Sequence, residues 1–219
     1  MSTKDVEFIK PLDESTWEDF ESLMSQSRIT KQCWCMAHLM DPKNLVIEEE
    51  ARLESQSLVN ARKKKGLIYY QNNNPVGWVS YGLRQELKGF DYRNDGDPAD
   101  WVIHCFYFLR GEAMAERQEA LIKKIINEVS SGVHPSSQSC RIAAYPREQR
   151  CETRNMNFGG KLQTFLNCGF KIQNKISDSA VCVALEVPSQ KDLESRNQRD
   201  NSKAENALKD VRRKLKIVK

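Results

Sequence analysis

The feature that most constrains the fold is a near-continuous apolar run at residues 101–109, followed at once by an amphipathic helix. The run reads Trp-Val-Ile-His-Cys-Phe-Tyr-Phe-Leu. A strand that is apolar on both faces is typical of the centre of a sheet covered on both sides. Residues 113–129 then carry an apolar stripe at helical spacing, with Gln118 as a polar exception: Met114, Leu121, Ile122, Ile125, Ile126 and Val129. This strand–loop–helix unit predicts an α/β domain.

The rest of the chain supplies further strands and helices around this unit. Apolar and alternating segments predict strands at residues 6–12, 67–70, 75–82, 140–145, 170–172 and 181–187. Helices are expected at residues 13–24 and 45–64 and in a short segment that ends near Cys168. The helix at 45–64 is acidic early and basic late, which matches the helix dipole, and Gly66 is placed to end it. A polar loop of about fifteen residues precedes residue 101.

The order of these elements indicates the fold class. The middle of the chain alternates strands with helices, and the two ends form hairpins, the first around the turn at Asn72, Asn73 and Asn74. This arrangement predicts a mixed, mostly antiparallel twisted sheet flanked by helices. We expect one domain over residues 1–188.

Residues 189–219 form a charged tail with a different composition. Residues 190–219 contain ten Lys and Arg against five Asp and Glu, whereas the whole chain has a net charge of +4. The core is therefore near neutral, and its charge does not support a function in nucleic-acid binding. The tail is expected to be disordered or a marginal basic helix built on Leu208, Val211 and Leu215. It could attract an acidic partner, or it could serve only to keep the chain soluble.

Composition narrows the class of protein and its compartment. Hydrophobic residues make up 39% and charged residues 29% of the chain, as in soluble proteins. We find no apolar run near the roughly 20 residues of a membrane span and no segment typical of a signal peptide. The seven cysteines are scattered, and three fall in expected strands, which favours reduced thiols over a disulfide framework. A cytoplasmic location is expected.

The order of the elements, together with three local motifs, resembles the GCN5-related N-acetyltransferase (GNAT) superfamily over residues 6–187. The strand containing Val76-Gly77-Trp78 is similar to the third strand of that superfamily, and the unit at 101–129 is similar to its cofactor-binding unit. Phe165 to Phe170, which ends in Gly-Phe, is similar to the end of its fourth helix. The segment Cys33-Trp34-Cys35-Met36 resembles a signature of one bacterial subgroup.

The resemblance implies a binding site for acetyl-coenzyme A (acetyl-CoA). A helix N-terminus with exposed amides binds a pyrophosphate well. By position, the strand side of the site is Phe106, Tyr107 and Phe108, and the loop and helix side is Arg110, Gly111, Ala113, Ala115 and Arg117. The loop departs from the superfamily pattern, because Gly111 is its only glycine and Glu112 and Glu116 add negative charge. These two acidic residues could instead simply favour the first turn of the helix.

The residues for proton transfer also depart from the superfamily pattern. Acetyl transfer requires a deprotonated amine and a protonated leaving thiolate. Phe165 stands where many members carry an acidic tyrosine. The candidates that remain are Tyr145 as the acid, with Tyr107 as another nearby phenol, and His104 or Glu148 as the base. His104 could equally be a core residue, since it lies within an apolar strand.

Cys33, Trp34 and Cys35 are candidates for the acceptor site, with Cys33 and Cys35 as free and potentially redox-sensitive thiols. Together with His38 they supply only three zinc ligands, and no second pair stands at zinc-finger spacing, so no metal is expected.

Two functions follow from the resemblance. One is an acetyl-CoA-dependent N-acetyltransferase that acts on a small-molecule or protein amine. The alternative is a catalytically degenerate GNAT-fold module for binding or regulation, in which the usual cofactor binding is lost. The missing tyrosine and the altered loop favour the second function, and the order of the elements favours the first.

Overall fold

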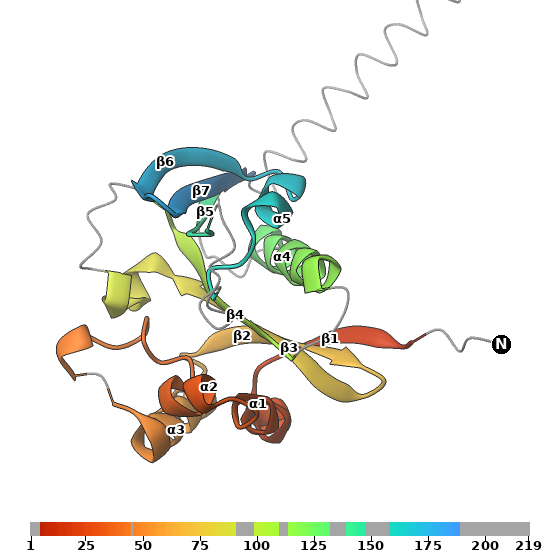
Figure 1. Ribbon diagram of the computed structural model, residues 1–219, viewed down its shortest axis with the longest axis vertical. Coiled ribbons are helices and arrows are strands. Elements are labelled where there is room, and N and C mark those ends of the chain that lie inside the picture. Colours follow the sequence, from red (N-terminus) through yellow and green to blue (C-terminus); the bar gives the residue numbers. More distant parts are fainter. Residues whose placement is uncertain are drawn as a thin grey trace, which may run out of the picture.

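The computed structural model describes residues 5–44, 46–90, 99–109, 114–131, 139–147 and 158–188. Seven strands form one sheet in the order β1-β2-β3-β4-β5-β7-β6 (Figure 1). All neighbouring strands are antiparallel except β4 and β5, which are parallel. The strands are β1 Glu7–Pro11, β2 Lys65–Gln71, β3 Asn74–Leu83, β4 Trp101–Phe108, β5 Cys140–Ala144, β6 Lys171–Ser177 and β7 Ala180–Val187. The expected mixed, mostly antiparallel sheet is confirmed.

The helices cover both faces of this sheet. In Figure 1, α1 (Trp17–Met24), α2 (Arg28–Cys33) and α3 (Glu48–Asn60) lie on one face, and α4 (Met114–Ser130) and α5 (Leu162–Asn167) lie on the other. Each face has its own apolar cluster. The cluster under α1–α3 contains Phe20, Trp34, Met36, Ile68 and Trp78, and the cluster under α4 and α5 contains Leu121, Ile122, Ile125, Phe106 and Phe165. The central strands of the sheet are therefore buried on both sides, as the apolar β4 predicts, whereas the edge strand β6 is exposed.

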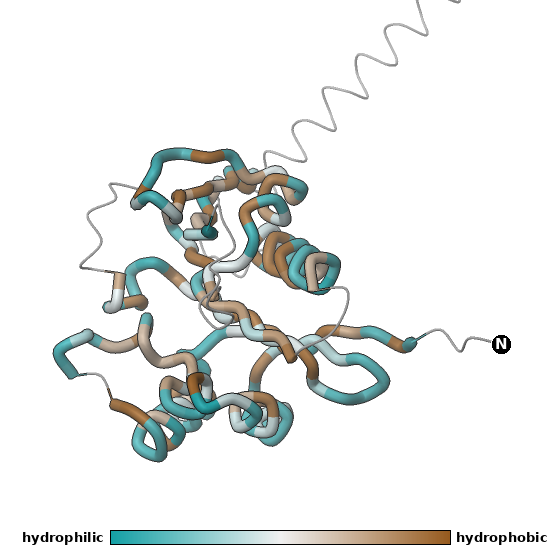
Figure 2. Tube along the Cα trace, viewed as in Figure 1, coloured by the Kyte–Doolittle hydropathy of each residue, from teal (hydrophilic) through white to brown (hydrophobic). Residues whose placement is uncertain are grey.

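The predicted amphipathic helix corresponds to α4. Most of its apolar stripe faces the sheet (Figure 2), and Leu121, Ile122 and Ile125 are fully buried, whereas Met114 in the first turn is exposed. Gln118, the polar exception in the stripe, is also buried, and its Oε1 accepts a hydrogen bond from the Lys161 backbone N–H at 3.1 Å. The exception therefore has a structural role, because it holds the segment before α5 against α4.

The prediction of one helix over residues 45–64 is wrong at its C-terminal end. α3 ends at Asn60, Arg62 takes a left-handed conformation (φ 56°), and the Lys63 and Lys64 N–H groups both bond to Leu58 O. Gly66 does not end the helix. It lies within β2, where its missing Cβ leaves room for the Trp78 ring. The sequence pattern also does not predict α2.

The segment after β3, which the sequence predicts to be a polar loop, contributes apolar side chains to the core. Two 3-10 turns, Arg84–Glu86 and Lys88–Phe90, follow β3. Leu87 and Phe90 are fully buried, next to Val102 and Tyr145. Gly89 donates its N–H to His38 O at 3.1 Å, which docks the second turn against the segment after α2.

The C-terminal part of the domain follows the prediction. α5 ends at Asn167 with Cys168 as its C-cap, Gly169 has a φ of +89°, and Phe170 is buried. The charged tail at 189–219 lies outside the described residues. No helix within the described part of the chain is long and apolar enough to cross a membrane.

Candidate active site at the fork between β4 and β5

The two central strands β4 and β5 separate partway along their length. They pair only through Trp101–Ile142, Val102–Ala143 and Ile103–Ala144, after which β5 ends and β4 continues to Phe108. The edge of β4 that would face β5 is thus left without a strand partner from His104 onward. We call this point the fork. It is the one place in the described sheet where two neighbouring parallel strands end at different levels.

His104 is the extra residue of a β-bulge at the fork. Ser80 pairs with Cys105 and Tyr81 pairs with Ile103, so β4 has one more residue than β3 at this step. A bulge bends the strand and redirects a side chain. The His104 ring lies with its Nε2 3.2 Å from the Ser80 hydroxyl, and only 6% of the residue is exposed.

Aromatic rings connect His104 with two other polar side chains. The His38 ring centroid is 5.0 Å from that of His104 and 4.7 Å from that of Phe90. Tyr145, the first residue after β5, lies 5.3 Å from Phe90 on the same ring-to-ring basis, and His104 lies 6.1 Å from Phe90. The predicted catalytic residues His104 and Tyr145 therefore share Phe90 as a neighbour.

His38 is a functional candidate that sequence reasoning misses. The sequence suggests only that it could join Cys33 and Cys35 as a zinc ligand, whereas in the structure its ring lies against His104. No local sequence pattern indicates that His38 lies beside His104. The contact is a long-range one, in a region where the Gly89 N–H also docks on His38 O. Within the described residues, no group of three or more His, Cys, Asp or Glu side chains could hold a metal ion.

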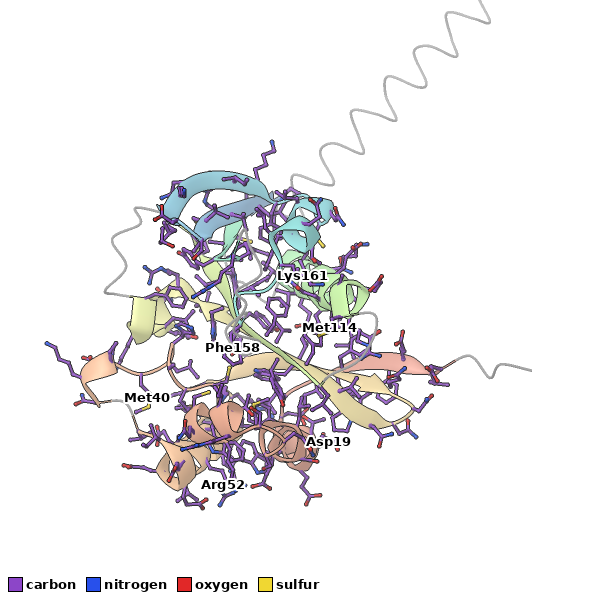
Figure 3. All side chains as sticks on the ribbon, in the orientation of Figure 1. Asp19, Met40, Arg52, Met114, Phe158 and Lys161 are labelled. Atoms are coloured by element: carbon purple, nitrogen blue, oxygen red, sulfur yellow. The ribbon has the colours of Figure 1, made fainter. Side chains whose placement is uncertain are left out.

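A backbone segment of the chain lies beside β4 beyond the fork. Phe106 donates its N–H to Phe158 O at 2.7 Å, and Figure 3 shows Phe158 beside the central strands and Lys161 near α4. The glycines of this segment are tightly packed, because a Cβ at Gly159 would lie 2.4 Å from Tyr145 O and one at Gly160 would lie 2.3 Å from Gln118 Nε2. The N–H group of Phe106, a residue expected at the cofactor, is therefore already hydrogen-bonded to the segment at residues 158–161.

The other residues expected at the cofactor are spread over several places. Phe106 is buried under α4 and α5, Tyr107 packs on the opposite face, and Phe108 stacks on Phe106 at 6.2 Å. Arg117 is buried, bonds to Gln71 Oε1 at 2.8 Å and lies 3.9 Å from Glu7, toward β1 and β2. Ala115 lies in the first turn of α4. Arg110, Gly111, Ala113 and Glu148 lie outside the described residues.

Phe165 fills the position where a tyrosine acid is usual in the superfamily. It is fully buried and makes edge-to-face contacts with Phe106 at 5.9 Å and Phe170 at 5.2 Å. A hydroxyl group here would need a partner inside an apolar cluster. The structure therefore gives Phe165 a packing role.

The three acceptor-site candidates are mostly inside the core. Trp34 is 2% exposed and Cys35 5% exposed, whereas Cys33 is half-buried. Trp34 and Cys35 both have left-handed backbone conformations, with φ of 43° and 54°. The Trp78 indole N–H donates to Cys35 Sγ at 3.3 Å. All cysteines in the described part of the chain are free thiols.

Lys64 lies next to these thiols as a buried ammonium group. It donates hydrogen bonds to Trp34 O and, at 2.7 Å, to Ser55 Oγ. Burial lowers the pKa of Lys64 to about 8, although the nearby Cys35 opposes this shift. A hydrogen bond from Cys105, supported by the Lys64 charge and Trp78, lowers the pKa of the Cys35 thiol to about 7. Lys64 therefore lies in the core and not in the basic last turn predicted for the second helix.

These two shifts predict that the folded state gains stability as the pH rises from about 6.5 to 8. The unfolded chain keeps the Cys35 proton until near pH 9 and the Lys64 proton until near pH 10.5, whereas the folded chain releases them near 7 and 8. The unfolded state thus binds more protons in this window, so the free energy of unfolding increases with pH.

Urea unfolding of the wild type and of the Cys35→Ser, Lys64→Met double variant measures this contribution. Between pH 6.5 and 8, the free energy of unfolding should rise more in the wild type than in the variant, by on the order of 1 kcal/mol. The thiols with raised pKa, such as Cys168 and Cys140, oppose the gain only at higher pH and are common to both proteins. Equal pH dependence in the two proteins would contradict the shifts.

Comparison with known proteins gives matches among solved structures only. No protein-family model and no curated protein matches the chain. Among the matching structures is an N-acetyltransferase from Staphylococcus aureus Mu50, with 14% identity over 83% of this chain and 98% of that chain and a TM-score of 0.46. An aminoglycoside 6'-N-acetyltransferase from Enterococcus faecium matches with 11% identity, 84% and 98% coverage and a TM-score of 0.49.

A further match is an acetyltransferase described as of the GNAT family, from Streptococcus pneumoniae, with 10% identity, 83% and 99% coverage and a TM-score of 0.44. This is the superfamily that the sequence resembles. At such identities and TM-scores the matches carry no inference about the reaction or the acceptor of this chain.

Proposed function

We propose that the chain transfers an acetyl group from acetyl-CoA to an amine, with the reaction centre at the fork between β4 and β5. The observation that carries this proposal is His104, which lies on a β-bulge where the two strands separate, with His38 beside it and Tyr145 against their shared neighbour Phe90. A thioester and an amine held together at this point would react largely through proximity and orientation.

The side chains at the fork fit the two proton transfers of this reaction. His104 accepts the proton from the attacking amine, and Ser80 fixes the direction of its ring. The amine nitrogen then bonds to the acetyl carbon, the carbon–sulfur bond breaks, and the Tyr145 hydroxyl protonates the departing thiolate. The acceptor is a small-molecule or protein amine.

A binding module without cofactor is the second candidate, and one contact favours it. The Phe106 N–H is already bonded to Phe158 O, so a pantetheine chain along β4 has to displace residues 158–161. The fully buried Phe165 in place of a tyrosine acid points in the same direction. If this segment stays in place, the fold persists without acetyl transfer.

A thermal-shift measurement with acetyl-CoA distinguishes the two functions. A ligand at one hundred times its Kd adds about 2.7 kcal/mol to stability, which raises the Tm of a chain this size by about 5–10 °C. We expect such a rise with acetyl-CoA and none with equimolar ATP, which controls for phosphate and adenine. No rise at millimolar acetyl-CoA would instead support the binding module.

A further inference from the structure

Three thiols and one ammonium group meet under β3 and β4, on the face of the sheet opposite α4. Cys33 and Cys35 come from the segment that ends α2, Cys105 comes from β4, and Lys64 lies just before β2. We call these four residues the thiol cluster. Among the described residues, the groups that act electrostatically on Lys64 are these three thiols, Cys35 most strongly. The proposed acetyl transfer does not use this cluster.

The charge of Lys64 requires a negative partner. The side chain is 2% exposed, and its described contacts are a carbonyl, a hydroxyl, the Met36 sulfur at 3.8 Å and the Phe20 ring at 4.9 Å. Among the described residues, no carboxylate lies within ion-pair distance of Lys64. A buried ammonium group without a counter-charge is costly. The Cys35 sulfur, as a thiolate, supplies that counter-charge.

The hydrogen bonds around Cys35 separate the roles of the thiols. The Trp78 N–H donates to Cys35 Sγ at 3.3 Å, and Cys105 packs against the same apolar cluster as Cys35 and Trp78. The donated N–H and the nearby ammonium group of Lys64, which is bonded to the flanking Trp34 O, both favour an anion at Cys35. The interaction between the two thiols lowers the pKa of Cys35 and raises the pKa of Cys105, so Cys105 is the thiol that keeps its proton. An activated thiolate in contact with a neutral thiol is the arrangement of a reactive cysteine and its resolving partner.

We propose that the thiol cluster is a redox site in which a hydroperoxide converts Cys35 and Cys105 into a disulfide. The Cys35 thiolate attacks one peroxide oxygen and the O–O bond breaks, which gives a sulfenic acid on Cys35. The second oxygen leaves as hydroxide or alkoxide and takes a proton from solvent to become water or an alcohol. The Cys105 sulfur then displaces the sulfenic oxygen as water and forms the S–S bond. Two thiols are oxidised and one hydroperoxide is reduced. Cys35 itself is buried, but Cys33 and Cys105 are partly exposed, so a small oxidant would enter the cluster beside these two thiols. This site is independent of the proposed acetyl transfer.

Peptide mapping after treatment with hydrogen peroxide tests the proposal directly. Trypsin releases Cys33 and Cys35 in residues 32–43 and Cys105 in residues 94–110. We expect these two peptides to be linked by a disulfide in the oxidised wild type. The Cys33→Ser variant, which keeps both proposed partners, should form the same link, and the Cys35→Ser and Cys105→Ser variants should not.

The role of Lys64 is tested by the rate of this reaction. In a Lys64→Met variant, linking at pH 7 should slow by about tenfold or more, because the thiolate loses its counter-charge. If this variant does not fold, the formation of thiolate is followed by its ultraviolet absorbance as the pH of the wild-type protein is raised. One thiol should lose its proton near pH 7 in the wild type, and this transition should be absent from the Cys35→Ser variant. Linking that persists in Cys35→Ser, a bond between Cys33 and Cys35 instead, or no linking in the wild type would overturn the proposal.

Discussion

Replacing Gly66 by alanine should destabilise the protein by at least about 3 kcal/mol, although it adds only one methyl group. A Cβ at this position would lie 1.9 Å from the Trp78 ring atom Cη2 and 2.5 and 2.6 Å from its two neighbours. Trp78 is fully buried, its ring lies 4.6 Å from Phe20, and its N–H is bonded to Cys35. The ring therefore has no room to move, and a close-packed core responds to overpacking with strain.

Gly82→Ala is the matched control, because Gly82 lies in β3 and its added Cβ would meet Leu87 at an ordinary 3.4 Å. Its free energy of unfolding should stay within about 1 kcal/mol of the wild type. Replacing Trp78 by phenylalanine removes the ring atoms that clash. Gly66→Ala should therefore lower the free energy of unfolding by about 1–3 kcal/mol less in the Trp78→Phe background than in the wild type. Urea unfolding of the wild type, the two single variants Gly66→Ala and Trp78→Phe, and the double variant measures this coupling. A wild-type midpoint for Gly66→Ala would show that β2 and Trp78 are not packed in this way.

Gly66 also shows where prediction from sequence stops. Gly66 follows a run of lysines after a helical pattern, and such a glycine is typical of a helix end. In the structure it serves a tertiary contact with Trp78, twelve residues along the chain in the partner strand β3. The prediction that Lys64 lies at the end of a helix is wrong for a similar reason. Its charge predicts a solvated side chain, but the chain leaves the helix at Asn60 and turns Lys64 into the core.

The elements that the sequence does predict are those with strong periodicity. β4, α4, the β2–β3 hairpin and the Gly-Phe end of α5 lie where their local patterns indicate. The fork is different, because it depends on where β5 ends relative to β4 and on a one-residue bulge. Neither feature has a local signal. His104 and Tyr145 are predictable as single candidates, but the contact of His104 with His38 and the packing of Tyr145 on Phe90 join residues that are far apart in the sequence.

Replacing His104 by alanine should lower the rate of acetyl transfer by about 10²–10⁴-fold, the usual contribution of a positioned acid or base. The reason is geometric, since His104 stands at the fork with its ring held by Ser80. The Kd for acetyl-CoA should not change, because the proposed role of His104 is in proton transfer. Cys105→Ser is the matched control: it alters the adjacent strand residue by one atom on the face toward α1–α3 and should keep the wild-type rate.

The most direct measurement of acetyl transfer is the release of CoA from acetyl-CoA in the presence of amines. Polyamines, amino acids, amino sugars and peptides with free N-termini cover the classes of acceptor. The account predicts amine-dependent release by the wild type with at least one class, retained by Cys105→Ser and lost by His104→Ala. Release that does not depend on an amine, or that is equal in the wild type and His104→Ala, would contradict a reaction centre at the fork.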